Sequence, residues 1–251
     1  MFKNKFSQIE RDEIVSLASE TIFESSDDAE VARRYLLDER DISEQTIRRF
    51  QIGYVPMRAK HSLSGRIILP ITDMVGRNVA LTTRLIVDKS YLGKHWHESF
   101  SKKKYIYGIQ ENLDQIILKR KVILVEGQFD ALRLCDSGMP IAVATLGSSV
   151  SIYQLCKLIQ LADDIFLCFD NDDAGKKAVS QVFSLLKKYQ LWRQKDINII
   201  TVPIRGVKDP DEYISRYGKK DFIKRLKESK QRYEAKYRKN ESGSVFDFEI
   251  V

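Results

Sequence analysis

The feature that most constrains the fold is a regular alternation of apolar runs and amphipathic stretches that begins at residue 121. Apolar runs such as KVILV, PIAVATL, IFLCF and INIITVPI have the length of buried strands, whereas stretches such as SIYQLCKLIQLA have the spacing of helices. Nearly continuous apolar runs are typical of strands that helices cover on both faces. The pattern therefore predicts an α/β unit with a parallel sheet flanked by helices.

The residues before and after this unit follow other patterns. The stretches EIVSLASETIF, AEVARRYLLDE and SEQTIRRF predict short helices, and RIILPITD and NVALTTRLIV, joined by the turn-like MVGR, predict a β-hairpin. A basic segment follows DPDEYISRYG, has a helical pattern and ends at NESGS. We expect a helical and β-hairpin subdomain at residues 1–110, the parallel-sheet domain at 111–215, a basic helical segment at 216–239, and a linker with a tail at 240–251.

Composition excludes several classes of protein. With 43% hydrophobic and 31% charged residues in 251, the chain is globular and long enough for one or two cores. It has no apolar stretch of membrane-spanning length and no signal-peptide pattern at its start, so we expect a cytoplasmic protein without a membrane partner. The cysteines form no C-x-x-C pair, which argues against a zinc ribbon and predicts buried thiols. They are Cys135, Cys156 and Cys168.

The charge distribution permits a polyanionic partner. The formal net charge is +7, and residues 216–239 contain 11 lysines and arginines against 3 acids. Shorter basic clusters lie at residues 102–104 and 119–121. Because each cluster taken singly is better explained as a solvated face, charge alone does not assign a nucleic-acid site.

Acidic pairs follow three of the predicted strands. In an open parallel sheet, ligands bind beyond the carboxyl ends of the strands, so acids at these positions carry more weight than acids elsewhere. The first pair lies about one helical turn apart, and the second shares one side of an extended chain. The pairs are Glu126 with Asp130, Asp170 with Asp172, and Asp209 with Asp211.

Converging carboxylates repel one another, and divalent cations relieve that repulsion. Ligand sets made only of oxygen select magnesium or manganese over zinc, and such a site suits phosphoryl transfer. A helix cap, a turn or a surface charge explains any one of these acids equally well. The metal hypothesis therefore depends on all three pairs falling at strand ends.

The order EGQFDALRL, FDNDDAGKKA, KDPDEYI resembles the Toprim domain that bacterial-type primases, topoisomerases and some nucleases share. The resemblance implies a Toprim-type parallel sheet, with Glu126, Asp170 and Asp172 as catalytic residues and Glu126 as a candidate general base. It also implies that Asp130, Asp209 and Asp211 join these three as ligands of Mg²⁺ or Mn²⁺.

The preceding segment resembles the catalytic core of DnaG-type DNA primases. The similarity lies in ARRYLLDERDISEQTIRRFQIGYVP, GRIILPITDMVGR, TTRLI and KKKYIYGI, and it extends over roughly residues 25 to 217. It implies a DNA-directed RNA polymerase, a nucleotidyltransferase that makes RNA primers on a single-stranded DNA template from ribonucleoside triphosphates. The basic residues that match the family's nucleic-acid and nucleotide groove are Arg49, Arg66, Arg84, Lys89 and Lys102.

The chain departs from the family at several points. Gln128 replaces an aromatic residue and Asn171 replaces a glycine, and both changes concern substrate contacts more than metal ligands. We expect the protein to lack the zinc-binding module that usually precedes the core, and most of the helicase-docking domain that usually follows it. A core without these parts resembles a phage or mobile-element primase. We expect such a primase to depend on a replicative helicase or another replisome protein, and to extend a primer better than it starts one.

Other functions remain open. A Toprim nuclease would use the same metals for hydrolysis, and a non-catalytic nucleic-acid-binding subunit would need no metal. A topoisomerase is disfavoured because it needs a tyrosine-bearing domain, and the absence of a G-x-x-x-x-G-K-[ST] loop excludes a P-loop helicase motor.

Three short segments are open to more than one interpretation. His95-Trp96-His97 fits a surface strand better than a metal site. Residues 147–149 fit a phosphate site or a plain helix cap. The tail at residues 245–251 fits a docking strand for a partner, an edge strand of the protein's own sheet, or a disordered end.

Overall fold

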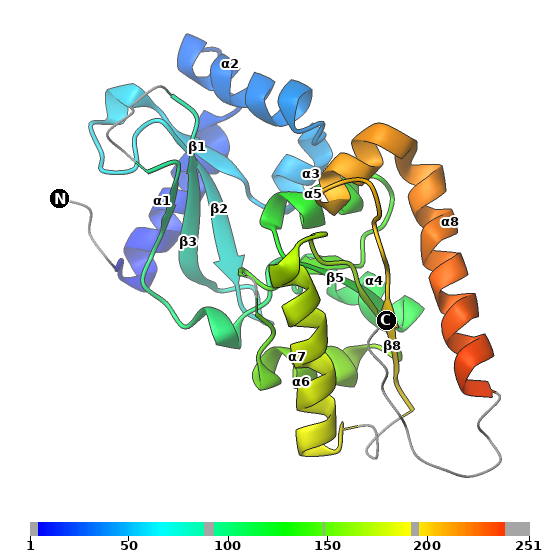
Figure 1. The fold of residues 1–251 in the computed structure, drawn as a ribbon. Helices are drawn as coiled ribbons and strands as arrows, with labels where there is room; N and C mark the ends of the chain where they lie inside the picture. The colour runs from blue at the N-terminus through cyan, green and yellow to red at the C-terminus, as the bar shows by residue number, and fades with distance from the viewer. Residues whose placement is uncertain (1–4, 88–92, 148, 192–195, 239–251) are drawn as a thin grey trace. The chain divides into compact units, whose positions relative to one another are not determined.

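The computed structural model describes residues 5–87, 93–147, 149–191 and 196–238 (Figure 1). The chain divides into two compact units. The first contains residues 1–101 and 107–111, and the second contains residues 102–106 and 112–251. Two sequence-based expectations, the nucleotide-binding role of Lys89 and the docking tail at 245–251, lie outside the described residues.

The first unit begins with the short helices that the sequence predicts. Each starts at a serine whose hydroxyl accepts a hydrogen bond from a backbone N–H in the first turn, and this contact satisfies one of the free donors at a helix start. Helix α2 continues into a π-helical turn at Tyr35–Glu39. The bounds are Gln8–Thr21 for α1, Asp27–Arg34 for α2 and Glu44–Arg49 for α3.

An antiparallel sheet with the order β1-β2-β3-β4 completes this unit. Strands β2 and β3 form the predicted hairpin, and β4 is a partly exposed strand at the edge of the sheet. Buried side chains of α1, among them Val15 and Ala18, pack with Ile68 and Leu81 of the sheet. The strands are β1 at Gly53–Val55, β2 at Arg66–Thr72, β3 at Asn78–Leu85 and β4 at His95–His97, with a 3-10 turn at Met57–Ala59.

A buried ion pair fixes α1 to the sheet. Arg11 Nη2 lies 3.0 Å from Glu98 Oε1, and the two side chains are 6% and 1% exposed. Glu98 also accepts hydrogen bonds from the backbone N–H groups of Phe6 and Leu81, and Arg11 donates to the carbonyl oxygens of Phe6 and Asn78. Because both charges are extensively hydrogen-bonded, removing either partner would leave the other buried and uncompensated.

The second unit contains the predicted parallel sheet, with the strand order β6-β5-β7-β8. Connections between parallel strands are right-handed, so α5, which leads from β5 to β6, lies on one face, and α6 and α7 lie on the other. Helix α8 follows β8 and packs against α5 (Figure 1). The strands are β5 at Lys121–Val125, β6 at Ala142–Ala144, β7 at Asp164–Leu167 and β8 at Asn198–Thr201.

Two helices of this unit lie where the sequence predicts them, α6 at SIYQLCKLIQLA and α8 over the basic segment, whereas α4 was not predicted. Helix α6 begins with a capping box formed by Ser151 and Gln154. The bounds are Leu113–Lys119 for α4, Gln128–Asp136 for α5, Ile152–Leu161 for α6, Asp173–Tyr189 for α7 and Pro210–Arg238 for α8, and a 3-10 turn spans Lys102–Lys104.

Helix α8 contains most of the basic segment, and part of this segment is packed against the sheet. The helix breaks at Gly218, where φ is 79°. Phe222 is fully buried, and Lys230 forms an ion pair with buried Asp164 at the start of β7. Part of the positive charge of this segment is therefore neutralised by an ion pair within the unit.

Two further sequence-based expectations can be compared with the structure. Cys135 and Cys168 are buried as predicted, whereas Cys156 is only half-buried. Among the described residues, no helix combines the length and apolar character needed to cross a membrane.

Candidate functional site

The carboxyl ends of β5, β7 and β8 lie side by side in the sheet, which brings acidic loops together at one edge. The backbone N–H of Asp170 donates a hydrogen bond to Glu126 Oε1 at 3.2 Å. The backbone N–H of Asp211 donates to Asp130 Oδ1 at 3.3 Å. The loops that follow β5, β7 and β8 are thus held against one another through acids that the sequence analysis selected.

The other two acids of the set begin helices. Asp172 Oδ1 accepts a hydrogen bond from the backbone N–H of Gly175 at 2.9 Å, which makes Asp172 the N-cap of α7. Asp209 Oδ1 accepts from the backbone N–H of Glu212 at 2.8 Å, directly before Pro210 at the start of α8. The helix-cap interpretation therefore applies to these two, although in each case the capping bond uses only one carboxylate oxygen.

Burial and mutual repulsion raise the pKa values of three acids at this edge, Glu126, Asp130 and Asp170. Burial, together with the charges of Asp170 and Asp172, raises the pKa of Glu126 to about 7. Burial, together with the charges of Asp209, Asp170 and Asp211, raises the pKa of Asp130 to about 8. The pKa of Asp170 is raised in the same way, by burial first and by Asp209 next. All six predicted acids are therefore close enough to interact electrostatically.

Two basic residues that the sequence analysis did not select also belong to this edge. Arg133 Nε lies 3.6 Å from Asp211 Oδ1, and the positive charge of Lys208 lowers the pKa of Asp170 against the effect of burial. Arg133 follows Asp130 by three positions on α5, so helical spacing was the available signal.

The donor chemistry of this edge fits a divalent cation. Asp170 Oδ1 is buried and has no hydrogen-bond partner, an arrangement that costs free energy unless a cation or water compensates it. The acids supply only oxygen ligands, which suit magnesium or manganese. Among the described residues, however, no three acid, histidine or cysteine side chains are already gathered in a metal-binding geometry. The fit of this edge to a divalent cation therefore depends on its oxygen donors and on the repulsion between its acids, because the described residues do not form a preformed coordination site.

Gly175 allows the close approach of α7 to the Asp170 loop. A Cβ at this position would lie 2.0 Å from the carbonyl oxygen of Asp170 and 3.1 Å from Glu126 Oε1. We expect Gly175→Ala to destabilise the protein by about 2 kcal/mol, because the overlap with backbone outweighs the higher helix propensity of alanine. Urea unfolding measures the change. Gly147→Ala is the control, since its Cβ meets nothing within 4 Å; equal stability of the two variants would contradict the predicted overlap.

The raised pKa of Asp130 predicts a pH-dependent stability. A carboxyl group whose pKa is higher in the folded protein stabilises the fold fully at low pH and loses that contribution as pH rises through the folded pKa, here about 8. In EDTA, Asp130→Asn should therefore be clearly more stable than the wild type at pH 8, and nearly equal to it at pH 4. Urea unfolding at the two pH values tests this. The exposed Asp114→Asn should show no such difference, and a pH-independent effect of Asp130→Asn would refute the assignment.

The predicted groove residues have different environments. Arg49 is exposed, with its guanidinium carbon 4.9 Å from the ring centroid of Phe50. Arg84 is half-buried and contacts the ring of His95, and Lys102 is half-buried with its pKa lowered by burial. These three side chains remain candidates for phosphate contact.

Arg66 does not fit the expected exposed role. It is 1% exposed, and its guanidinium donates to the carbonyl oxygen of Gly93 at 2.9 Å and to Thr83 Oγ1 at 3.3 Å. The burial indicates a structural role, and a nucleic-acid or nucleotide contact by Arg66 stays a prediction. Burial lowers the pKa of His95 most, and the charges of Arg84 and Arg40 lower it further. The sequence analysis did not select Arg40.

The second unit matches a known family. Residues 123–214, from within β5 to within α8, match the family described as Toprim-like. The second unit contains a Toprim-like domain. All of the predicted metal-site acids lie inside the matched segment, so the Toprim-like match covers the complete acidic edge.

Over a longer span, the chain is similar to bacterial DNA primases. It is 31% identical over 218 residues to the DNA primase of Borreliella burgdorferi, which covers 73% of this chain and 40% of that protein. It is 30% identical over 226 residues to the DNA primase of Thermotoga maritima, which covers 77% of this chain and 39% of that protein. The chain thus spans about two fifths of the length of these relatives, with the Toprim-like domain in the shared part.

Solved structures show the same fold. The structure of the DnaG catalytic core aligns with a TM-score of 0.78 at 21% identity, covering 88% of this chain and 79% of that one. The DnaG primase catalytic domain bound to single-stranded DNA aligns with a TM-score of 0.77 at 21% identity, covering 88% and 80% of the two chains. The Toprim-like domain and the residues before it therefore have the fold of a primase catalytic core.

Proposed function

We propose that this chain is the catalytic core of a DNA primase, which synthesises short RNA primers on single-stranded DNA by nucleotidyl transfer that depends on Mg²⁺ or Mn²⁺. The observation that carries the proposal is the meeting of three acidic segments at one sheet edge. Glu126 accepts a hydrogen bond from the backbone N–H of Asp170, and Asp130 accepts one from the backbone N–H of Asp211. Similarity to bacterial primases, at 31% identity over 218 residues, supports polymerisation as the reaction of this edge.

The acidic edge provides the ligands and a proton acceptor. A divalent cation bound there would neutralise charge on the attacking hydroxyl and on the departing pyrophosphate. Glu126 has its pKa raised to about 7, so near neutral pH it is partly ionised and suited to accept the proton of a primer 3′-hydroxyl. The proposed metal ligands are Glu126, Asp130, Asp170, Asp172, Asp209 and Asp211.

We assign the exposed or half-buried basic residues Arg49, Arg84 and Lys102 to phosphate contacts with the template and the ribonucleoside triphosphate. A relative of the same fold is described as bound to single-stranded DNA, which supports that class of template. We further propose action in the cytoplasm, the host's if the gene is from a phage, together with a replicative helicase or another replisome protein.

A synthesis assay tests the proposal. The chain is incubated with single-stranded DNA, an annealed short oligoribonucleotide, labelled ribonucleoside triphosphates and magnesium, with EDTA replacing magnesium in a parallel reaction. We expect the oligoribonucleotide to be extended only with magnesium. Shortening of the DNA without RNA synthesis would instead identify a nuclease, and no reaction with unchanged DNA binding would identify a non-catalytic binding subunit.

A further inference from the structure

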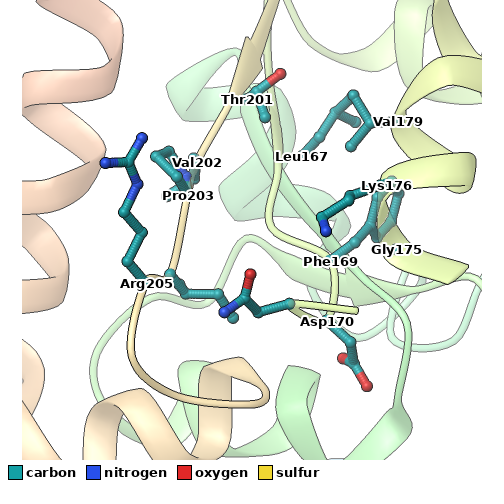
Figure 2. Close-up of a pocket in the computed structure, with 12 residues that line it drawn as sticks. Leu167, Phe169, Asp170, Gly175, Lys176, Val179, Thr201, Val202, Pro203 and Arg205 are labelled. Carbon is teal, nitrogen blue, oxygen red and sulfur yellow. The ribbon is translucent and has the colours of Figure 1, made fainter. Parts of the chain in front are cut away.

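A cavity of about 230 Å³ lies next to the acidic edge, in the second unit. It lies between the first turns of α7 and the segment that follows β8 (Figure 2). Its apolar walls come from Leu167, Phe169, Val179, Val202 and Ile204. Of these, only Val179 is appreciably exposed, so the others form a floor that belongs to the packed core.

Two cationic side chains line the same cavity. Lys176 and Arg205 are exposed and lie on opposite sides of it in the view of Figure 2. Among the described residues, Arg205 makes no hydrogen bond or ion pair. Lys176 forms an ion pair with Asp173 at 3.4 Å, and this pair is weak because both side chains are exposed. The cavity thus combines an apolar floor with two exposed positive charges.

Asn171 holds the wall of this cavity in place. Its side-chain amide donates to the carbonyl oxygen of Val207 at 3.2 Å, and its backbone N–H donates to the carbonyl oxygen of Lys208 at 2.7 Å. These bonds fix the loop that contains Arg205 against the Asp170 loop.

We propose that this cavity binds one nucleotide, with its base against the apolar floor and its phosphate between Lys176 and Arg205. The volume is below that of sites for drug-sized ligands and suits one base, and a lysine and an arginine that line the same cavity suit phosphate. The choice of a nucleotide over other aromatic anions rests on the proposed function, because the cavity shares the Asp170 loop with the acidic edge.

Calorimetric titration with GTP in EDTA tests the proposal, because without a divalent cation the acidic edge repels a triphosphate. A second titration uses a 5′-phosphorylated hexathymidylate, since the nucleotide could be free or belong to a strand. The variants are Lys176→Glu and Arg205→Glu, and the matched control is Lys177→Glu, an exposed neighbour on α7 that does not line the cavity.

We expect each cavity variant to weaken binding of at least one probe about tenfold, and Lys177→Glu to change it less than about twofold. Loss with GTP identifies a free nucleotide, and loss with the oligonucleotide alone identifies a strand. Equal losses in all three variants, or no saturable binding of either probe by the wild type, would overturn the proposal.

A variant that fills the cavity distinguishes binding inside the cavity from a general effect of surface charge. Val179→Phe adds bulk to the cavity wall without changing charge, and should reduce binding as the charge variants do. Thermal unfolding of each variant verifies folding. Magnesium-dependent RNA synthesis is measured separately on the wild type. Absence of synthesis would contradict the proposed function, whereas the titrations in EDTA test nucleotide binding in the cavity independently.

Discussion

Asp170→Asn is expected to lower the rate of RNA synthesis about a thousandfold while the fold and the affinity for single-stranded DNA stay close to those of the wild type. The amide keeps the size of the carboxyl group but removes the charge of an acid whose buried oxygen, Asp170 Oδ1, lacks a hydrogen-bond partner. Single-turnover extension of an annealed oligoribonucleotide measures the rate, and fluorescence anisotropy measures DNA affinity.

Asp173→Asn is the matched control for this experiment. Asp173 lies three positions further along the chain, at the first residue of α7, and its side chain is 89% exposed, so the variant should retain nearly full activity. If Asp170→Asn retained synthesis within a few-fold of the wild type, Asp170 would not be a metal ligand.

Arg11→Ala should destabilise the first unit by about 3–5 kcal/mol, the usual cost of leaving a buried charge without its partner. Glu98 would keep its hydrogen bonds from the backbone N–H groups of Phe6 and Leu81 but lose the guanidinium, in a site where it is 1% exposed. Urea unfolding followed by circular dichroism measures the loss.

The exposed pair Arg34 and Glu30 provides the comparison. Its side chains are 70% and 48% exposed, so Arg34→Ala should cost less than about 1 kcal/mol. A double variant, Arg11→Met with Glu98→Gln, should recover part of the loss, because it removes both buried charges together. A cost for Arg11→Ala as small as that of Arg34→Ala would show that the buried pair does not stabilise the fold.

Local patterns predicted most of the secondary structure and the acidic edge. Strands β5 and β7 were recognisable because their apolar runs are continuous, and the acids directly after them were placed by the rule that parallel strands present their carboxyl ends at one edge. The same local reasoning could not decide whether Asp172 and Asp209 were ligands or helix caps, because both roles place an acid before a helix.

Features that depend on distant partners were not predictable. Arg11 and Glu98 are separated by 87 positions, and Asn171 and Val207 by 36, so no periodicity within either segment links them. Arg66 matched an expected DNA-binding residue by its place in the hairpin, but its burial depends on the chain near Gly93, which covers it. Pattern reasoning therefore placed the acids at one sheet edge more accurately than it described the surroundings of individual side chains.

Calorimetric titration with Mn²⁺ near pH 7 tests the central claim most directly, in two buffers that differ in their heat of protonation. If the acidic edge is a metal centre, the wild type should bind the ion saturably and release protons, because the pKa values of Glu126 and Asp130 are raised to about 7 and about 8 before the ion binds. Asp170→Asn should bind at least roughly tenfold more weakly, and Asp173→Asn should bind like the wild type. Saturable binding that is the same in all three proteins, or no binding at all, would contradict the assignment of this sheet edge as the catalytic metal site.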